Sequence, residues 1–286
     1  MTLIVTLLGI LADRVFPRLS DDRRFRRLLD WHAWIRARLE RQGDWPVAIL
    51  SLFPFWLAVL LVQGWLGNGL AGLVFQLLVL VWCLGPRDLA ADVATWLEVA
   101  AAGDSALRGE AAARLLDGMS PATQGAPVPE RIDQTRIAHA VLVAGCERLF
   151  GALFWFALFG PVGAVAWRSV AVLYRASGTG QADKAMETLY SLLLWLPARL
   201  LATGYALVGH FDAAFEGWRE AHRRHPEGAA GSLTVLAETG LGALAAGVDG
   251  AGDDSGLVRS AMRLVWRSLV IWLVVLSLLT LAGWGG

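Results

Sequence analysis

The feature that most constrains this chain is an uncharged run at residues 149–167. At 1.5 Å per residue, a helix of this length reaches about 28 Å, close to the hydrocarbon thickness of a bilayer. A run of this length without charge is typical of a spanning helix. The run therefore predicts a membrane segment.

The flanks of this run are unusual for a simple span. Glu147 and Arg148 stand at its near edge, Gly160-Pro161 interrupts it, and Arg168 follows it directly. Ionisable groups inside a membrane are costly and usually mark a pathway or a site. Segment 139–175 is therefore predicted to be a broken core membrane helix, and if it begins near His139, Glu147 and Arg148 lie inside the membrane.

Composition extends this prediction to the whole chain. Of its 286 residues, 56% are hydrophobic and 17% charged, and its mean hydropathy is +0.51. Soluble domains carry roughly 25% charged residues. Because the formal net charge is zero, nothing indicates nucleic-acid binding. We predict an all-α, polytopic integral membrane protein with four or five spanning helices, plus amphipathic and re-entrant helices on the cytoplasmic side.

Apolar and basic stretches alternate along the chain. Nine arginines between Arg14 and Arg41, among helically spaced apolar residues, predict a basic helix at the cytoplasmic surface. Gly67-Asn68-Gly69 separates two apolar runs and predicts a hairpin. The predicted segments are a basic amphipathic helix (12–44), a helical hairpin (45–84), a soluble helical insertion (85–138), the broken core helix (139–175), a Pro/Arg-containing membrane helix (189–208), a soluble helical segment (210–263) and a last span (264–284).

Arginine placement also indicates orientation. It puts the basic helix and the soluble insertion on the cytoplasmic side. Nine Lys/Arg between Arg168 and Arg263 favour the same side for 210–264, although the rule weakens for long loops. The side of that segment stays open, because it depends on whether 161–175 returns as a re-entrant half and whether 189–208 spans.

The sequence holds no standard catalytic signature. There is no GxxxxGK[ST], HExxH or GxSxG motif, and Cys83 and Cys146 are far apart with no Cys/His cluster. No catalytic or metal-ligating residue is therefore predicted. His222 and His225 stand at a spacing that can bind metal, but with Arg223 between them they fit a solvated basic cluster better. A phosphate-bearing ligand suits this cluster better than a metal ion does.

Four further charges, Glu147, Arg148, Arg168 and Arg199, lie at the edges of apolar runs or within them. Arg199 follows Pro197, so it can pair with the carbonyl that the proline frees or with a carboxylate such as Glu147. In one interpretation these charges neutralise one another where helices cross. In the other, they form an interfacial cavity whose arginines hold the phosphates of an anionic amphiphile. The residues alone favour neither.

Several segments carry a family resemblance: MTLIVTLLGILADRVFPRL, RRLLDWHAWIRARLERQ, RLFGALFWFALFGPVGAVAWR, LLLWLPARLLATGYALVGHFDAAFEGWR and LAETGLGALAAG. In this order the chain resembles the AmpE family over nearly its whole length. The resemblance implies a multi-pass bacterial inner-membrane protein, encoded beside the cytoplasmic amidase AmpD, that acts in signalling for β-lactamase regulation. It does not by itself assign an enzymatic activity.

The same segments are similar to the cobalamin-biosynthesis family CbiB/CobD, which joins an aminopropanol unit to a corrinoid carboxylate in an ATP-dependent amide ligation. Several parts of that family's pattern are changed, and its early His-Pro is absent around residues 28–30. Glu147 stands at about the place of an aspartate, Ala152 replaces a proline, and Glu227-Gly228-Ala229 replaces Ser-Pro-Asn. ATP and magnesium are therefore implied only if the ligase activity was kept.

The leading hypothesis is an AmpE-like regulatory protein of the bacterial inner membrane, involved in cell-wall-linked β-lactamase regulation. A groove between 139–175 and 189–208 is expected to bind a phosphorylated amphiphile or nucleotide. The candidate ligand-binding residues are Glu147, Arg148, Arg168, Arg199, His222, Arg223 and His225. Two alternatives are a CbiB/CobD-type ligase or derived activity, and a membrane adaptor that docks AmpD through the basic helix. The bilayer is the expected partner in every case.

Overall fold

The computed structural model describes residues 25–39, 43–67, 69–84, 89–102, 105–117, 134–177, 183–224, 228–245 and 256–279. Within these ranges the regular structure is helical, without a strand. Three helical stretches are long and apolar enough to cross a membrane, Asp44–Leu66, Gln134–Ala176 and Lys184–Val208, and Leu70–Cys83 is apolar but shorter. The predicted all-α membrane class is confirmed, and the count of four or five spans stays a prediction.

The chain divides into two compact units, each described by itself. Unit 1 comprises Met1–Arg87, Gly151–Leu193 and Leu276–Gly286, and unit 2 comprises Asp88–Phe150 and Leu194–Val275. The helices of unit 1 are α2 (Arg26–Arg38), α3 (Asp44–Leu66), α4 (Leu70–Cys83), α9 (Gly151–Ala176) and the first part of α10 (Lys184–Val208). Unit 2 holds α5 (Leu89–Ala102), α6 (Ser105–Asp117), α8 (Gln134–Ala144), a π-helical turn (Gly145–Phe150), the rest of α10, α11 (Phe211–Arg224), α12 (Gly228–Leu244) and most of α13 (Gly256–Leu279).

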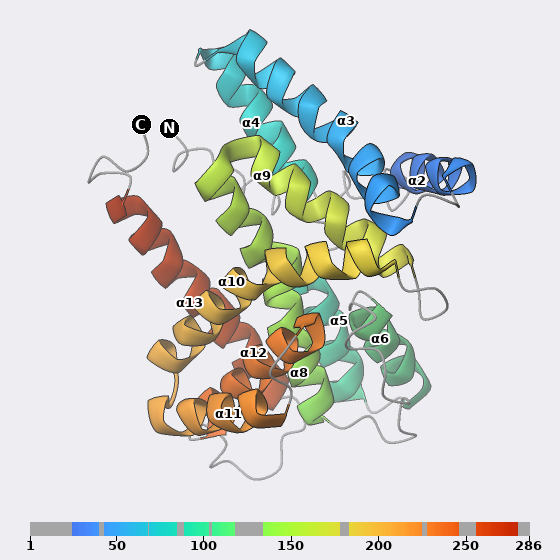
Figure 1. The fold of residues 1–286 in the computed structure, drawn as a ribbon. Coiled ribbons are helices and arrows are strands. Elements are labelled where there is room, and N and C mark those ends of the chain that lie inside the picture. Colours follow the sequence, from blue (N-terminus) through green and yellow to red (C-terminus); the bar gives the residue numbers. More distant parts are fainter. Residues whose placement is uncertain are drawn as a thin grey trace. The chain divides into compact units, whose positions relative to one another are not determined.

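Helix α9 is a helical hairpin (Figure 1). Its turn lies at Gly160, whose φ of 66° lies in the left-handed region that glycine tolerates best. Pro161 lacks an N–H and begins the second arm, where no donor is needed. A Cβ on Gly163 would lie 2.2 Å from Trp155 O, and one on Gly151 would lie 2.5 Å from the Trp167 ring. Both pairs are centred on residue 159, so the arms run antiparallel in close contact. The break expected at Gly160-Pro161 is confirmed.

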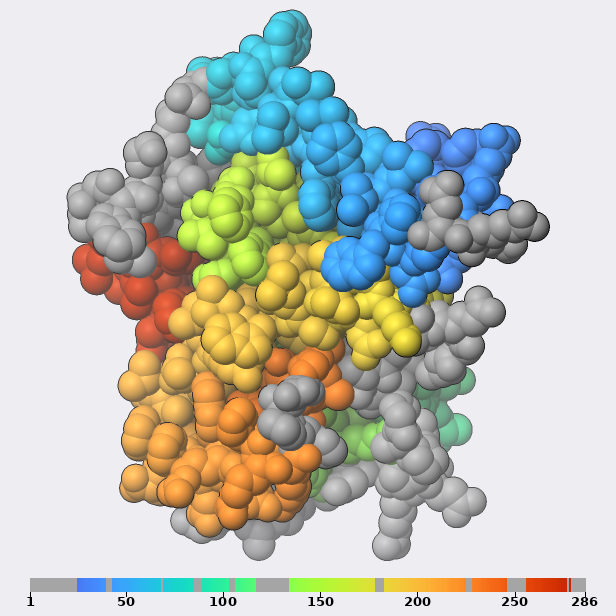
Figure 2. Space-filling model, viewed as in Figure 1, coloured from blue at the N-terminus to red at the C-terminus, as the bar shows by residue number. Residues whose placement is uncertain are grey.

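The outer surface of α3 and α4 is apolar. Helix α9 packs against both of these helices and so covers part of them. Leu57, Leu61 and Trp65 of α3 and Leu78 of α4 are nevertheless exposed. Figure 2 shows the surface of α3 in blue. Exposed apolar side chains along helices of this composition form a surface that lipid can cover.

Unit 2 is built around α12, which is buried along most of its length. Helix α11 packs on it at backbone distance: a Cβ on Gly217 would lie 2.5 Å from Glu238 O, and one on Gly242 would lie 2.4 Å from Ala213 O. These pairs run in opposite directions along the two helices, which are therefore antiparallel. Small residues permit this approach, as they do between membrane helices generally.

Candidate functional site

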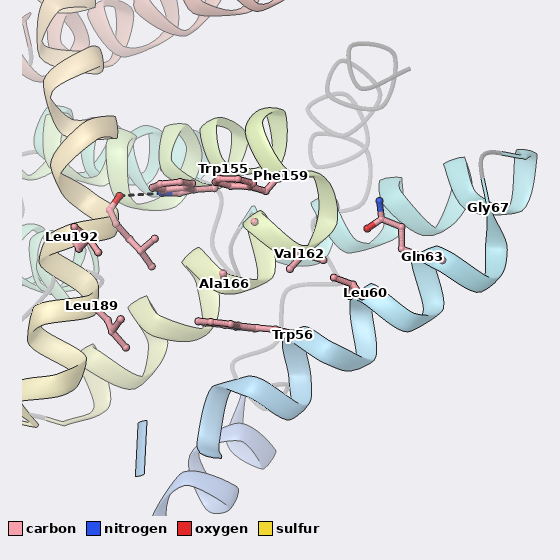
Figure 3. A pocket seen from close by; sticks show the side chains of 13 residues that line it. Trp56, Leu60, Gln63, Gly67, Trp155, Phe159, Val162, Ala166, Leu189 and Leu192 are labelled. Atoms are coloured by element: carbon pink, nitrogen blue, oxygen red, sulfur yellow. Dashed lines mark hydrogen bonds between the residues drawn. The ribbon is translucent and has the colours of Figure 1, made fainter. Parts of the chain in front are cut away.

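A groove of about 800 Å³ in unit 1 is a candidate site (Figure 3). It lies among α3, both arms of α9 and the first part of α10. Its size is in the range of small-molecule sites. The residues that line it are Trp56, Leu60, Gln63, Gly64, Gly67, Trp155, Phe159, Val162, Gly163, Ala166, Leu189, Leu192 and Leu193.

The aromatic walls of the groove are fixed by hydrogen bonds. Trp155 Nε1 donates to Leu193 O at 3.0 Å, and the Trp155 ring stacks on Phe159 with 5.8 Å between centroids. On the opposite wall, Trp56 Nε1 donates to Ser169 Oγ at 3.2 Å. Because both indole N–H groups are occupied, the rings offer the groove their apolar faces. The groove is therefore suited to a hydrocarbon chain.

One polar side chain lies near the far end of the groove. Gln63 projects from the last turns of α3 toward the turn of α9 (Figure 3). A Cβ on Gly160 would lie 3.6 Å from Gln63 Nε2, so amide and turn are in close proximity. Among the described lining residues, Gln63 alone carries a side-chain amide.

A polar cluster, buried at Asp183 and Ser51, lies where α2 meets the N-terminal parts of α3 and α10, also in unit 1. The Asp183 carboxylate is inaccessible to solvent and accepts a hydrogen bond from the Arg36 guanidinium. It also caps α10, since Met186 N donates to Asp183 Oδ1 at 3.3 Å. Lys184 N donates to Asp44 Oδ2 at 3.3 Å, which ties the start of α10 to the start of α3.

His32 completes this cluster. Its Nδ1 lies 2.9 Å from Ser51 Oγ, and its Nε2 lies 3.6 Å from Asp183 Oδ2. Burial lowers the pKa of His32, and Arg36 adds to that effect, although Asp183 opposes it. Ser51 Oγ donates its proton to Val47 O at 2.7 Å. The Ser51 hydroxyl therefore has a backbone acceptor in its own helix as well as the imidazole beside it.

The polar cluster lies next to one end of the groove. Ser51 precedes Trp56 by five residues on α3, and Lys184 precedes Leu189 by five residues on α10. Five helical residues correspond to about 7.5 Å. Both helices thus run from the polar cluster into the groove wall, and a molecule lying in the groove would have a charged region at that end.

The predicted charges Glu147 and Arg148 lie in unit 2, in the π-helical turn Gly145–Phe150. Both are buried, and Arg148 Nη1 pairs with Asp92 Oδ2 of α5 at 2.8 Å. In the same region Tyr205 donates its hydroxyl proton to Leu142 O at 3.0 Å. π-helical turns often accompany functional sites. Sequence reasoning missed Asp92 because it belongs to the segment predicted to be a soluble insertion.

The remaining predicted arginines of the apolar runs are placed separately. Arg168 belongs to unit 1, where it is buried and its guanidinium lies 5.3 Å from the Phe25 ring centroid. Arg199 belongs to unit 2 and donates to Trp195 O at 3.3 Å and to Ser232 Oγ at 3.4 Å. The carbonyl expected for Arg199, the one that Pro197 frees, is that of Leu193, and Trp155 takes it. The Leu193 carbonyl is therefore paired with a side chain from another helix and not with Arg199 of its own helix.

The basic cluster predicted on α11 is partly neutralised. Arg223 and Arg224 both pair with Glu220 of the same helix, and Arg223 is well exposed. His222 is exposed on the same helix, and His225 lies outside the described residues. Within the part of the chain that the structure describes, no group of three His, Cys, Asp or Glu side chains could hold a metal ion.

None of the predicted ligand-binding residues lines the apolar groove. Sequence signals for part of the observed site did exist. His32 and Arg36 stand at i, i+4 spacing on one face of α2, and Asp183 stands directly before an apolar helix, as a cap residue does. The sequence could not show that these residues are in contact, because Arg36 and Asp183 are 147 residues apart.

Comparison with known proteins identifies the family. A family model described as regulatory signalling modulator protein AmpE matches residues 1–284. The chain belongs to the AmpE family. Protein AmpE of Shigella flexneri is 23% identical over 294 residues, covering 99% of each chain. No solved structure matches.

Two relatives named as cobalamin biosynthesis proteins are also found. The cobalamin biosynthesis protein CobD of Chromobacterium violaceum is 26% identical over 82% of this chain and 78% of its own length. CobD of Stutzerimonas stutzeri is 28% identical over 51% of this chain, and the match spans 56% of that relative. The resemblance to both families is thereby confirmed.

The described residues do not fit the ATP and magnesium that a CobD-type activity implies. Glu147, which the resemblance places near that family's aspartate, has no solvent-exposed surface. Arg148 beside it is committed to Asp92. Among the described residues, carboxylate, imidazole and thiol groups are not gathered in threes that could hold a metal ion.

Proposed function

We propose that this AmpE-family protein is a multi-pass regulator of the bacterial inner membrane that binds an anionic amphiphile and acts in β-lactamase regulation. The hydrocarbon chain of the ligand lies in the groove among α3, α9 and α10, with its head group at the polar cluster. The observation that carries the proposal is the groove itself, whose walls are aromatic and aliphatic.

The occupant is a lipid chain because the groove opens on the apolar surface of unit 1. Leu60, Phe159 and Leu192 line it and are also among the exposed apolar side chains. A chain can therefore enter laterally from the bilayer without crossing a polar barrier. The one side-chain amide, Gln63, supplies a hydrogen-bonding group near the far end of the groove.

An anionic head group is supported by the charges beside the other end. Arg36 keeps a third of its side chain exposed while it pairs with Asp183. A guanidinium carries five N–H donors, so the pairing leaves donors for a phosphate. Arg26, Arg27 and Arg38 are exposed on the same helix. Helix α2 thus offers a basic surface to an anion.

Photo-crosslinking tests the proposal. The probe is a long-chain alkyl phosphate with a diazirine at the chain end, added to the full chain reconstituted in vesicles. Cross-links are expected in 56–67, 155–166 and 189–193. Ala166→Phe fills the groove and should reduce labelling several-fold, because its added ring occupies the space of the chain.

The matched control is Ala71→Phe, the same substitution at an exposed position of α4. It should label as the unaltered chain does. Equal labelling of Ala166→Phe and Ala71→Phe would overturn the proposal. In cells, Ala166→Phe should also alter β-lactamase induction, and Ala71→Phe should leave it unchanged.

A second candidate function is favoured by the two CobD relatives: an amide ligase of their kind or a derived activity. Complementation tests it in a cobalamin auxotroph that lacks CobD. Growth without cobalamin would support the ligase. Glu147 stands in place of the aspartate expected from the CobD resemblance, and it is buried. We therefore expect no growth.

A further inference from the structure

Helix α11 presents an aromatic strip that the groove and the polar cluster do not use. Phe211 and Phe215 are 56% and 51% exposed, and their rings stack with 6.2 Å between centroids and 4° between planes. Trp218 and His222 continue the strip at the i+7 and i+11 positions from Phe211. Spacings of three and four residues keep these side chains on one face of a helix.

The strip is bordered by arginine. The Arg219 guanidinium lies 5.9 Å from the Phe215 ring centroid, at the edge of the aromatic face. Arg223 and Arg224 follow in the last turn and pair with Glu220. An apolar aromatic face flanked by arginines is the composition of helices that lie in the bilayer interface.

The back of α11 is held rigidly. Ala214 and Ala221 are buried, and Gly217 meets the backbone of α12 at Glu238. Because these small residues pack directly on α12, α11 cannot rotate to bury its aromatic face against α12. The packing of α11 on α12 therefore fixes the direction in which the aromatic strip faces.

The strip continues the surface of a membrane helix. Leu207, in the last turn of α10, is 67% exposed, and Phe211 follows four residues later. Between them the chain bends at Gly209–His210, where His210 N donates to Ala243 O at 3.0 Å. A Cβ on Gly209 would lie 2.6 Å from Ala243 O, so this bend is tightly held. The orange surface of α11 can be followed in Figure 2.

We propose that α11 lies in the bilayer interface, with Phe211 and Phe215 at the boundary between head groups and acyl chains and Arg219 toward the lipid phosphates. The bilayer is the occupant because the strip continues from a helix apolar enough to span it. This assignment does not rest on the proposed ligand of the groove. It makes α11 a fixed anchor that sets the depth of unit 2 in the membrane.

Depth measurement tests the anchor in the full chain. Phe211→Cys, Phe215→Cys and Glu216→Cys are each labelled with an environment-sensitive fluorophore and reconstituted in vesicles of phosphatidylethanolamine and phosphatidylglycerol. Cys83 and Cys146 are buried, so the unaltered chain should take up no label. All three substituted positions are exposed, which spares the fold. Glu216 is the matched control on the polar face.

We expect the labels at 211 and 215 to be quenched by lipids with a doxyl group near the head and protected several-fold from aqueous iodide. The label at 216 should show the reverse. Equal iodide quenching at 215 and 216 would overturn the proposal, since the strip would then face water. Protection from iodide without quenching by doxyl lipid would also overturn it, because a protein would then cover the strip.

Discussion

At the scale of single residues, the best-defined polar group is Asp183, which is buried, paired and used as a cap. Asp183→Ala should lower the free energy of unfolding by about 2 kcal/mol, because it removes a cap and leaves Arg36 without its carboxylate. This value is below the roughly 3–5 kcal/mol for breaking a fully buried ion pair, because a third of the Arg36 side chain is exposed. Thermal unfolding in detergent measures the effect. Glu187→Ala, in the exposed first turn of α10, should change little.

His32 makes the polar cluster sensitive to pH. Its pKa is lowered from 6.5, mainly by burial, so folding favours the neutral imidazole over the charged one. The unfolded chain therefore binds a proton at higher pH than the folded chain does. Stability that is complete above pH 6.5 should be lost as pH falls from there through the lowered pKa. Unfolding midpoints measured from pH 8 to 5 should fall less in His32→Asn, and parallel curves would contradict this.

At the scale of elements, the turn of α9 depends on two glycines for different reasons. Gly160 needs a positive φ, whereas Gly163 needs the space that a Cβ would take from Trp155 O. Gly160→Ala should cost about 1–2 kcal/mol in the free energy of unfolding. Gly163→Ala should cost more, because the contact is with backbone and the arms must separate. Gly64→Ala, which meets open space, should be neutral or stabilising. An order in which Gly160→Ala is the worst would contradict this account.

The same elements show how far the sequence leads. Apolar runs and the breakers Gly160-Pro161 and Gly67 are local signals, so the helices and the break could be predicted. The partner of the carbonyl freed by Pro197 could not, because Trp155 reaches it from another helix. The π-helical turn around Glu147 likewise has no local signal in the sequence. In the sequence, the aromatic residues of the groove walls are recognisable only as apolar residues. Their place in the groove follows from how the helices pack.

At the scale of the whole molecule, the segments predicted to be cytoplasmic should share one side of the membrane. The nine Lys/Arg between Arg168 and Arg263 favour the side on which the basic helix lies. An interfacial α11 fits either side, because such a helix keeps its polar face in water wherever it lies, so the positive charges decide the side. We therefore expect α2 and the polar face of α11 to be exposed on the same, cytoplasmic side.

Labelling from each side of the membrane checks this topology. Arg27→Cys and Glu216→Cys both introduce a thiol at an exposed position. A membrane-impermeant maleimide should label both in inside-out vesicles and neither in right-side-out vesicles. Buried Cys83 and Cys146 should stay unlabelled in each preparation. Labelling of the two substituted positions from opposite sides would show that the chain crosses the membrane an odd number of times between α2 and α11. The positive charges of the α11 segment would then lie outside, contrary to the positive-inside rule from which the orientation is predicted.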